Sequence, residues 1–446
     1  MPLTALEIYK NLPKTNCKEC KFPTCLAFAM ALAQKKTSLA DCPHVSDDGK
    51  AALEGASAPP IRLVTIGTGE GKLEIGGETV LFRHELTFFH PPGLAVEVSD
   101  SMDDAALARA AGEIRSLSFE RVGMTIGVNL VAVRAESGKA ERFASAVKAL
   151  KGAGLPFVLM SRKPEEVEPA LKLLSGERPL IFAADKDTLN GMAALAKAYG
   201  APLALTAENL DELAELTPRA VSAGVADIVL GIEGGTLARN LQDMTICRRA
   251  ALKKGFRTLG YPLAVVASNP DPFAEAAAAS TYVAKYAGIV VVQGRSPAEI
   301  LPILTVRQNI FTDPQKPIQV KPGLYAIGEA SAKSPVLVTT NFSLTYYNVA
   351  GDVEASRVPS YIVVVDTEGT SVLTAFASDK LNADKVTAML KDGAGVGSKV
   401  THKKVIIPGL VAAMAAKLKD ASGWEVLVGP RESSGIAKFL KSLPVG

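Results

Sequence analysis

The cysteines of this chain are unevenly placed, and their spacing is typical of a metal centre. Four of the five lie within 26 residues, at Cys17, Cys20, Cys25 and Cys42, whereas Cys247 stands alone. Four thiolates are the ligand set of a 4Fe–4S cluster. Zinc sites with four cysteines more often contain two Cys-x2-Cys pairs, and this sequence has one. The spacing therefore favours the cluster, with zinc or disulfides as the alternatives.

The elements around these cysteines indicate a small N-terminal domain. Residues 26–40 have the composition of a helix that returns the chain to Cys42. The following stretch is small and polar and ends in Pro-Pro, which is typical of a linker. We therefore expect a cluster domain over 1–57 and a short β-rich connection over 58–92.

Length and composition exclude several classes of protein. At 446 residues the chain has room for about three domains, and 48% apolar residues allow a large core. The net charge of +3 gives no reason to expect nucleic acid as a partner. No apolar stretch is long enough to span a membrane, and no apolar signal segment opens the sequence. We expect a cytoplasmic protein whose thiols are free or bind metal.

The middle of the chain, 93–310, alternates short apolar runs with longer amphipathic segments. Continuous apolar strands are typical of a parallel sheet, and eight such units predict a (β/α)8, or TIM, barrel. The runs are LAVEVS (94–99), MTIGVNLVAV (124–133), PFVLMS (156–161), PLIFAA (179–184), PLALTA (202–207), DIVLGI (227–232), PLAVVAS (262–268) and GIVVVQG (288–294). All four histidines lie outside it, so we predict no catalytic residues there and favour a scaffold or docking surface.

A Pro-rich linker over 311–324 precedes a smaller α/β pattern at 325–446. Four apolar runs alternating with helical segments predict a doubly wound domain, whose ligand would lie outside the carboxyl ends of the strands. Glycine and hydroxyl residues are frequent there, and they suit close approach by a flat ligand. The sequence contains neither a dinucleotide-binding glycine motif nor a P-loop.

Residues 16–44 resemble the small iron–sulfur domain of corrinoid/iron–sulfur proteins. The order of cysteine-rich head, barrel and terminal α/β domain resembles the large, or gamma, subunit family of these proteins, which serves the anaerobic acetyl-CoA pathway. The resemblance implies a methyl carrier: a cobamide cobalt accepts a methyl group from a methyltetrahydrofolate:corrinoid methyltransferase and delivers it to acetyl-CoA synthase. It also implies a small barrel subunit as heterodimer partner, a reductive activator, and a cluster that relays an electron to return Co(II) to Co(I).

The cobamide contacts implied by this resemblance fall in the terminal domain. Most of the candidates follow a predicted strand, and the segment Ser371-Val372-Leu373 resembles the S-x-L element of other corrinoid domains. The candidates are Thr340, Tyr346, Thr370, Ser371, Val372, Leu373, Thr374 and Ser433. The D-x-H-x-x-G motif is absent, and His402 precedes a strand, so we expect a base-off cobamide without a histidine ligand.

Two other functions remain open from the residues. The first is an iron–sulfur electron-transfer subunit with a scaffold barrel and no corrinoid. Alternatively, Asp100, Asp185 and Asn269 at the barrel strand ends would suit a methyltransferase that binds a pterin itself. In the favoured interpretation the chain is a carrier whose turnover needs partner proteins.

Overall fold

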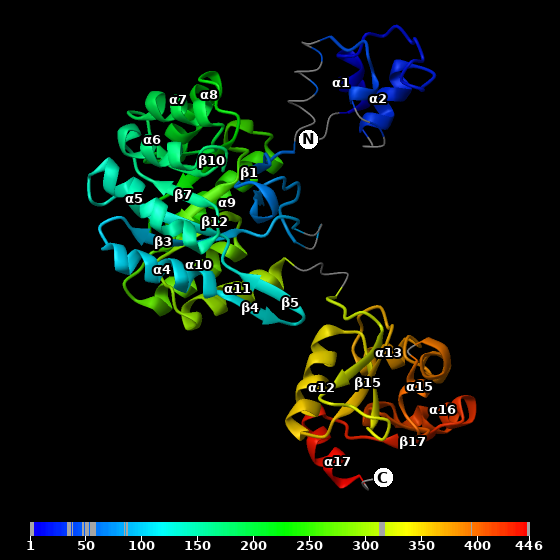
Figure 1. Cartoon of the computed structure of the whole chain (residues 1–446). Coiled ribbons are helices and arrows are strands. Elements are labelled where there is room, and N and C mark those ends of the chain that lie inside the picture. The colour runs from blue at the N-terminus through cyan, green and yellow to red at the C-terminus, as the bar shows by residue number, and fades with distance from the viewer. Residues whose placement is uncertain are drawn as a thin grey trace. The chain divides into compact units, whose positions relative to one another are not determined.

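The computed structural model describes residues 4–33, 37, 39–46, 49, 53, 59–83, 85, 88–311, 317–393 and 395–443. The described residues form two compact units, which are described separately (Figure 1). One contains the N-terminal head and the barrel, and the other contains the C-terminal domain together with Phe119–Ile126. Most of the first expected linker, 46–60, and residues 312–316 of the second, 311–324, lie outside the described residues. None of the described helices is long and apolar enough to cross a membrane.

The head contains two packed helices, α1 (Ala5–Lys10) and α2 (Cys25–Ala33). Thr4 and Glu7 form a capping box that starts α1, with the Thr4 hydroxyl accepting from the Glu7 N–H. Its small core consists of apolar residues and three of the four clustered cysteines: Ile8, Leu12, Cys20, Cys25, Phe28, Ala29, Cys42, Val45 and Leu53. The thiols are therefore part of what holds the head together.

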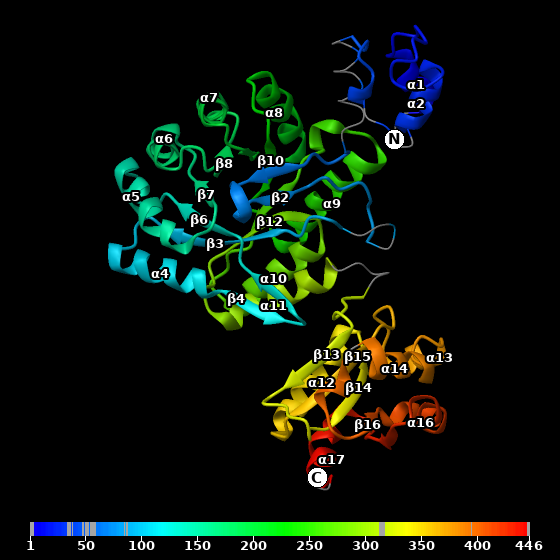
Figure 2. The same ribbon diagram turned by 45° about the vertical axis from the view of Figure 1, so that its right-hand side comes forward.

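The predicted (β/α)8 barrel is confirmed as a closed ring of eight parallel strands (Figure 2). Each strand pairs with the next in the chain, and the last pairs with the first. They are β3 (Gly93–Ser99), β6 (Leu130–Arg134), β7 (Phe157–Met160), β8 (Leu180–Ala184), β9 (Leu203–Leu205), β10 (Ile228–Ile232), β11 (Leu263–Val266) and β12 (Ala287–Val292). Nearly every strand residue is buried, which explains the continuous apolar runs.

Eight helices surround the strands: α4 (Asp104–Ser116), α5 (Ala140–Leu150), α6 (Pro164–Leu173), α7 (Leu189–Tyr199), α8 (Leu210–Ser222), α9 (Leu237–Lys253), α10 (Pro272–Ala284) and α11 (Pro297–Ile310). The antiparallel hairpin of β1 (Val64–Ile66) and β2 (Leu73–Ile75) packs into the barrel's interior core. Its side chains meet the first residues of the strands, so it closes the amino-terminal end of the barrel. Only the carboxyl end remains open for polar groups.

A second hairpin, β4 (Ser118–Arg121) and β5 (Met124–Gly127), was not predicted, because the run 124–133 looks like one continuous strand. In the structure Met124–Gly127 belongs to this hairpin, and the barrel strand β6 begins only at Leu130. The hairpin residues are largely exposed or half-buried, so no apolar pattern marks them.

The C-terminal domain is the predicted α/β fold, with a five-stranded mixed sheet in the order β13-β15-β14-β16-β17. The strands are β13 (Gly323–Ile327), β14 (Val336–Thr340), β15 (Ser360–Val365), β16 (Lys404–Ile407) and β17 (Glu425–Val428). β13 runs antiparallel along the edge, and the sequence pattern did not predict it. The chain reverses its direction of travel across the sheet between β14 and β16, which is a switch point where such folds bind ligands.

Helices cover both faces of this sheet. Core residues from α12 (Ser343–Ser356) and α17 (Ile436–Ser442) pack on one face. The opposite face packs against α13 (Val372–Ala377), α14 (Ala383–Ala388), α15 (Val396–Lys399) and α16 (Ala415–Ser422). Each face therefore has its own hydrophobic core, and the loops at the strand ends are held from both sides.

A buried ion pair ties the β-rich connection to the barrel. The guanidinium of Arg248 on α9 lies 3.4 Å from the carboxylate of Glu78 and donates to the Val80 carbonyl at 2.6 Å. It also lies over the rings of Phe88 and Tyr286. Burial raises the pKa of Glu78 and lowers the pKa of Arg248, and in each case the charged partner opposes the shift. The Glu78 carboxylate and the Arg248 guanidinium therefore stay charged in the interior because each offsets the burial cost of the other.

Replacing Arg248 with Met should therefore destabilise the barrel by about 3–5 kcal/mol, because it leaves a buried carboxylate without a partner. The double variant Glu78→Leu/Arg248→Met should lose much less. Lys151→Met, which breaks the exposed pair with Glu177, should cost less than about 1 kcal/mol. Denaturant unfolding measures all three. Equal losses in the single and double variants would show that the pair itself does not anchor the connection.

Candidate functional sites

In the head, the loop that carries Cys17 and Cys20 is fixed by two hydrogen bonds between Asn16 and Cys25. Cys25 is the first residue of α2, and its N–H donates to the side-chain oxygen of Asn16 at 2.8 Å. In return the Asn16 N–H donates to the Cys25 sulfur, at 3.4 Å. The His44 backbone N–H likewise donates to the Cys42 thiol. N–H groups directed at sulfur are among the interactions that tune iron–sulfur clusters.

The same loop contains unusual backbone angles. Four non-glycine residues have positive φ: Lys14 (60°), Asn16 (51°), Lys18 (65°) and Lys21 (64°). Such angles cost a lysine of the order of 1 kcal/mol each, and strain of this kind concentrates where a ligand is held. Left-handed residues alternating with others also turn N–H groups inward, as in the concave backbone around many iron–sulfur sites.

As they stand in the described structure, no three of the four thiols are close enough to share one zinc ion. In a tetrahedral zinc site with Zn–S bonds of about 2.3 Å, the sulfurs would lie about 3.8 Å apart. In the described part of the chain, only Cys17, Glu19 and His44 form a trio of donor atoms within 4.8 Å of one another, so no three of the four thiols do. Burial raises the pKa of the Cys42 thiol, and the other three thiols raise it further. A cationic core between them would reverse that repulsion.

The C-terminal domain has a cavity of about 220 Å³ at the carboxyl ends of β14, β16 and β17. It lies at the switch point of the sheet, and its walls are mostly apolar. Among the described residues that line it, Arg431 is the one charged side chain. The lining is Leu337, Val338, Thr339, Thr345, Val349, Ser371, Val372, Leu373, Ile406, Ile407, Pro408, Leu410, Gly429, Pro430, Arg431, Ser433, Ile436 and Phe439.

At and shortly after the end of β14, three buried hydroxyls have no hydrogen-bond partner, and the residue of one of them, Thr339, lines the cavity. They belong to Thr339, Thr340 and Ser343, all at most 1% exposed. An unpaired buried hydroxyl is costly, so it indicates a partner supplied from outside the chain. Nearby, a Cβ on Gly409 would lie 2.6 Å from the Gly429 carbonyl, so only glycine allows these two loops to meet.

The sequence candidates divide between the cavity wall and its surroundings. Ser371, Val372, Leu373 and Ser433 line the cavity together. Thr340 lies next to the lining residue Thr339, with its unpaired hydroxyl. Thr370 donates to the Thr367 carbonyl at 2.7 Å, and Thr374 accepts from the Ser371 hydroxyl at 3.1 Å.

Tyr346 does not line the cavity. It lies on α12 in the core of that face, 6% exposed, with its ring 5.0 Å from those of Tyr325 and Tyr347. Burial raises its pKa to about 12, so it stays a neutral phenol. Thr339 and Arg431 lie at predicted strand ends but were not chosen as contact candidates, and Thr345 was missed because it lies within a helix.

His402 is engaged with the backbone. One ring nitrogen lies 3.0 Å from the Ser334 carbonyl, and the other accepts from the Lys404 N–H at 3.2 Å. The residue precedes β16, at the edge of the sheet opposite the carboxyl ends that form the cavity. This arrangement fits the expectation that no histidine reaches a ligand there.

At the open end of the barrel, the polar side chains mostly satisfy one another. Arg162 bridges Asp185 at 3.0 Å and Glu233 at 2.6 Å between two cavities of about 360 and 320 Å³. Asp100 is fully buried and accepts three hydrogen bonds from Glu136 and Ser137. Arg162 and Asp100 are therefore both held by partners within the barrel.

Known proteins match this chain over its full length. A family described as "Putative Fe-S cluster" matches residues 12–44, and "CO dehydrogenase/acetyl-CoA synthase delta subunit" matches 63–440. The corrinoid/iron–sulfur protein large subunit of Moorella thermoacetica is 44% identical over 99% of both chains. The acetyl-CoA decarbonylase/synthase complex subunit gamma of Methanothermobacter thermautotrophicus is 39% identical, also over 99% of both chains.

A cysteine-bearing head, a (β/α)8 barrel and an α/β domain with a cavity at its switch point define a multidomain carrier or electron-transfer subunit. The chain belongs to the family of corrinoid/iron–sulfur protein large subunits and acetyl-CoA decarbonylase/synthase gamma subunits. The match named for a delta subunit begins only at residue 63, whereas these relatives also cover the cysteine head.

Asn16 provides a test of the cysteine loop. Asn16→Ala removes the acceptor for the Cys25 N–H and disfavours a φ of 51°, so it should lose iron to a chelator faster than the unmodified protein. Asn16→Gly removes the same acceptor but tolerates the angle, so its loss should be intermediate. Asn11→Ala, which alters an exposed bond at the end of α1, should change nothing. Visible absorbance over time measures the loss, and identical Ala and Gly rates would contradict a role for the backbone angle.

Proposed function

We propose that this chain is a methyl carrier in the acetyl-CoA pathway, with a 4Fe–4S cluster in the head and a base-off cobamide on the C-terminal domain. The observation that carries this proposal is the cavity at the sheet's switch point, beside buried hydroxyls that lack a partner. A cobamide, when bound, supplies a cobalt that can accept a methyl group and give it up again. Cys17, Cys20, Cys25 and Cys42 would hold the cluster, which would supply the electron that returns Co(II) to Co(I).

The size of the cavity indicates which part of the cofactor enters it. A volume of about 220 Å³ is below the range of about 300–1,000 Å³ that holds whole drug-sized ligands, and a corrin ring is larger still. We assign the cavity to the nucleotide tail, with Arg431 at its wall suited to the tail's phosphate. Thr339 lines the cavity and would offer its hydroxyl to the tail, and Ser371 and Leu373 form part of the same wall.

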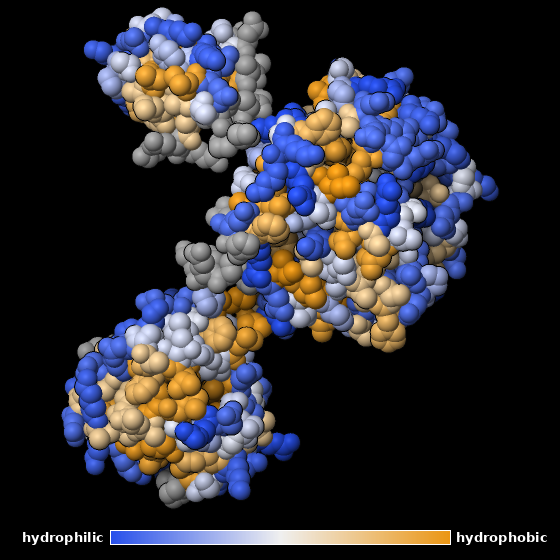
Figure 3. Space-filling model, turned by 180° about the vertical axis from the view of Figure 1, so that it is seen from behind, coloured by the Kyte–Doolittle hydropathy of each residue, from blue (hydrophilic) through white to orange (hydrophobic). Residues whose placement is uncertain are grey.

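The surface around the cavity can exclude water from the ring. Apolar side chains gather on the face of the C-terminal domain seen in Figure 3. Leu373 and Leu410 line the cavity, yet they remain 56% and 37% exposed. Exposed apolar groups beside a cavity mark a surface that a ligand or a partner covers.

The relatives are named as subunits of a larger complex, and we extend that to this chain. Its proposed partners are a small barrel subunit, a methyltetrahydrofolate:corrinoid methyltransferase as methyl donor, acetyl-CoA synthase as acceptor, and a reductive activator. The five cysteines are free in the structure, which suits a reducing cytoplasm. Catalysis in this scheme belongs to the partners, and this chain carries the group between them.

Metal analysis of anaerobically purified protein tests the function. We expect one cobalt and about four irons per chain, with corrinoid bands in the visible spectrum. His402→Ala should leave those bands unchanged, since both ring nitrogens already contact the backbone. Iron without cobalt would support the electron-transfer subunit instead, and a spectrum showing loss of a nitrogen ligand would overturn the base-off assignment.

Thr339→Val tests the tail assignment at nearly constant side-chain volume. The variant should retain the corrinoid about tenfold more weakly, because one hydrogen bond is lost. The cofactor-free protein should be as stable as before or more so, because a buried unpaired hydroxyl has gone. Thr387→Val removes another unpaired hydroxyl in the same domain, away from the cavity lining, and should not change retention. Equal retention in both variants would contradict the assignment.

A further inference from the structure

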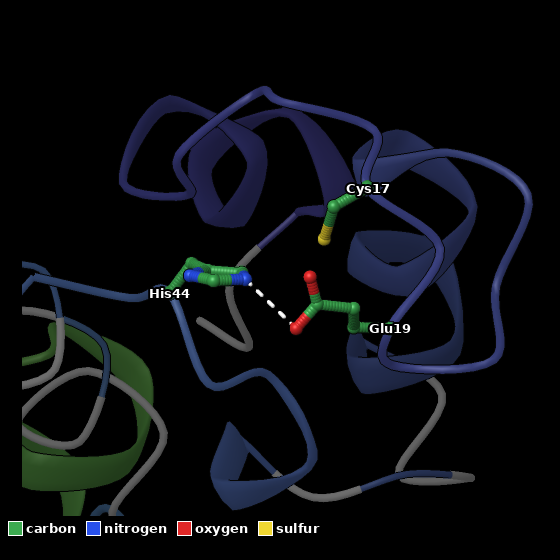
Figure 4. A group of neighbouring side chains, drawn as sticks. All are labelled: Cys17, Glu19 and His44. Carbon is green, nitrogen blue, oxygen red and sulfur yellow. Dashed lines mark hydrogen bonds and ion pairs between the residues drawn. The ribbon is translucent and has the colours of Figure 1, made fainter.

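The four cysteines of the head are not equivalent. Cys20, Cys25 and Cys42 are at most 9% exposed, whereas Cys17 is exposed. Beside Cys17, the imidazole of His44 lies 2.9 Å from the carboxylate of Glu19. Their donor atoms and the Cys17 sulfur all lie within 4.8 Å of one another, and Figure 4 shows the three side chains converging.

The groups facing the other cysteines are of a different kind. The sulfurs of Cys25 and Cys42 receive backbone N–H groups, which can hydrogen-bond to a thiolate but cannot bind iron. Carboxylate and imidazole are both iron ligands, and imidazole replaces thiolate in some iron–sulfur centres. Within the described residues, Cys17 is thus the cysteine of the four that has two further iron-binding side chains, Glu19 and His44, beside its sulfur.

Their positions in the chain keep these ligands in place independently of Cys17. Glu19 lies directly before Cys20, and His44 follows Cys42 and Pro43. Both are therefore anchored by buried cysteines that would remain bound to the cluster. Both side chains are also largely exposed, at 56% for Glu19 and 45% for His44, so either can turn toward an iron without disturbing the head's core.

We propose that Glu19 and His44 are a reserve ligand set for the iron at the Cys17 corner. This inference rests on the proposed cluster in the head. When the Cys17 thiolate is absent, a Glu19 oxygen or a His44 nitrogen forms the bond to that iron, and the Glu19–His44 contact opens. One ligand bond replaces another, no electron moves, and the numbers of iron and sulfide stay the same. The cluster then tolerates loss of its most exposed thiolate.

The test compares Cys17→Ala with Cys25→Ala in the full chain, purified anaerobically. Iron and sulfide analysis with Mössbauer and electron paramagnetic resonance spectroscopy gives a readout independent of methyl transfer. Cys17→Ala should keep about four irons, one of them spectroscopically distinct, whereas Cys25→Ala should fall to about three or fewer. Cys17→Ala/Glu19→Gln/His44→Phe should fall to about three, like Cys25→Ala.

A control separates folding from ligation. Glu19→Gln/His44→Phe with Cys17 intact should keep a complete cluster, which shows that the altered head still folds. The proposal that Glu19 and His44 are reserve ligands would be overturned if Cys17→Ala lost as much iron as Cys25→Ala. A complete cluster in the triple variant would overturn it as well. An unmodified protein without any 4Fe–4S signal would instead refute the proposed function from which the inference starts.

Discussion

The loop beside the cavity of the C-terminal domain depends on the side chain of one buried asparagine. Asn341 follows β14, is 1% exposed, and its oxygen accepts from the Thr367 N–H, the Thr367 hydroxyl and the Gly369 N–H, all within 3.0 Å. Its amide group donates to Gln319 and Asp366 at 3.1 Å. The loop after β15, which leads into Ser371 and the cavity wall, is therefore fixed to the end of the neighbouring strand. All five bonds use one amide group, and a backbone alone could not supply them.

Gly369 shows why this loop needs the residues that it has. Its φ is +72°, and a Cβ there would lie 2.7 Å from the Gln319 side chain that Asn341 also contacts. The preceding Glu368 is left-handed as well. This tight turn places Ser371 at the start of α13, next to the cavity. Sequence reasoning noted the glycine and the hydroxyls, but the asparagine that organises them lies about thirty residues earlier, and a local pattern contains no trace of such a contact.

The strands that could be predicted from the sequence are mainly those whose burial in a parallel sheet requires an apolar sequence. Parallel strands that are buried on both faces are continuously apolar, so the eight barrel strands and β14, β15 and β16 could be recognised. The edge strand β17 was recognised from its apolar run, although its residues are exposed or half-buried. The antiparallel edge strand β13 is half-exposed, and it was missed because its short run begins inside the Pro-rich segment interpreted as a linker. Missing β13 also led to a wrong expectation for Tyr346, because the ring of Tyr346 packs against Tyr325 on β13. Without that strand, Tyr346 looked free to face a ligand, whereas it packs beneath the sheet.

In the head, the four cysteine ligands could be predicted from the sequence, but the residues that surround them in space could not. Cysteine spacing identifies the four thiols, but the approach of His44 to Glu19 joins residues 25 positions apart and needs the folded loop. The core that positions them is small and includes Cys20, Cys25 and Cys42. A domain of about this size seldom buries enough apolar surface to fold securely alone, so metal binding and folding are coupled. The barrel and the C-terminal sheet have separate cores and do not share this dependence. Damage to the cluster should therefore unfold at most the head, leaving the barrel and the C-terminal domain folded.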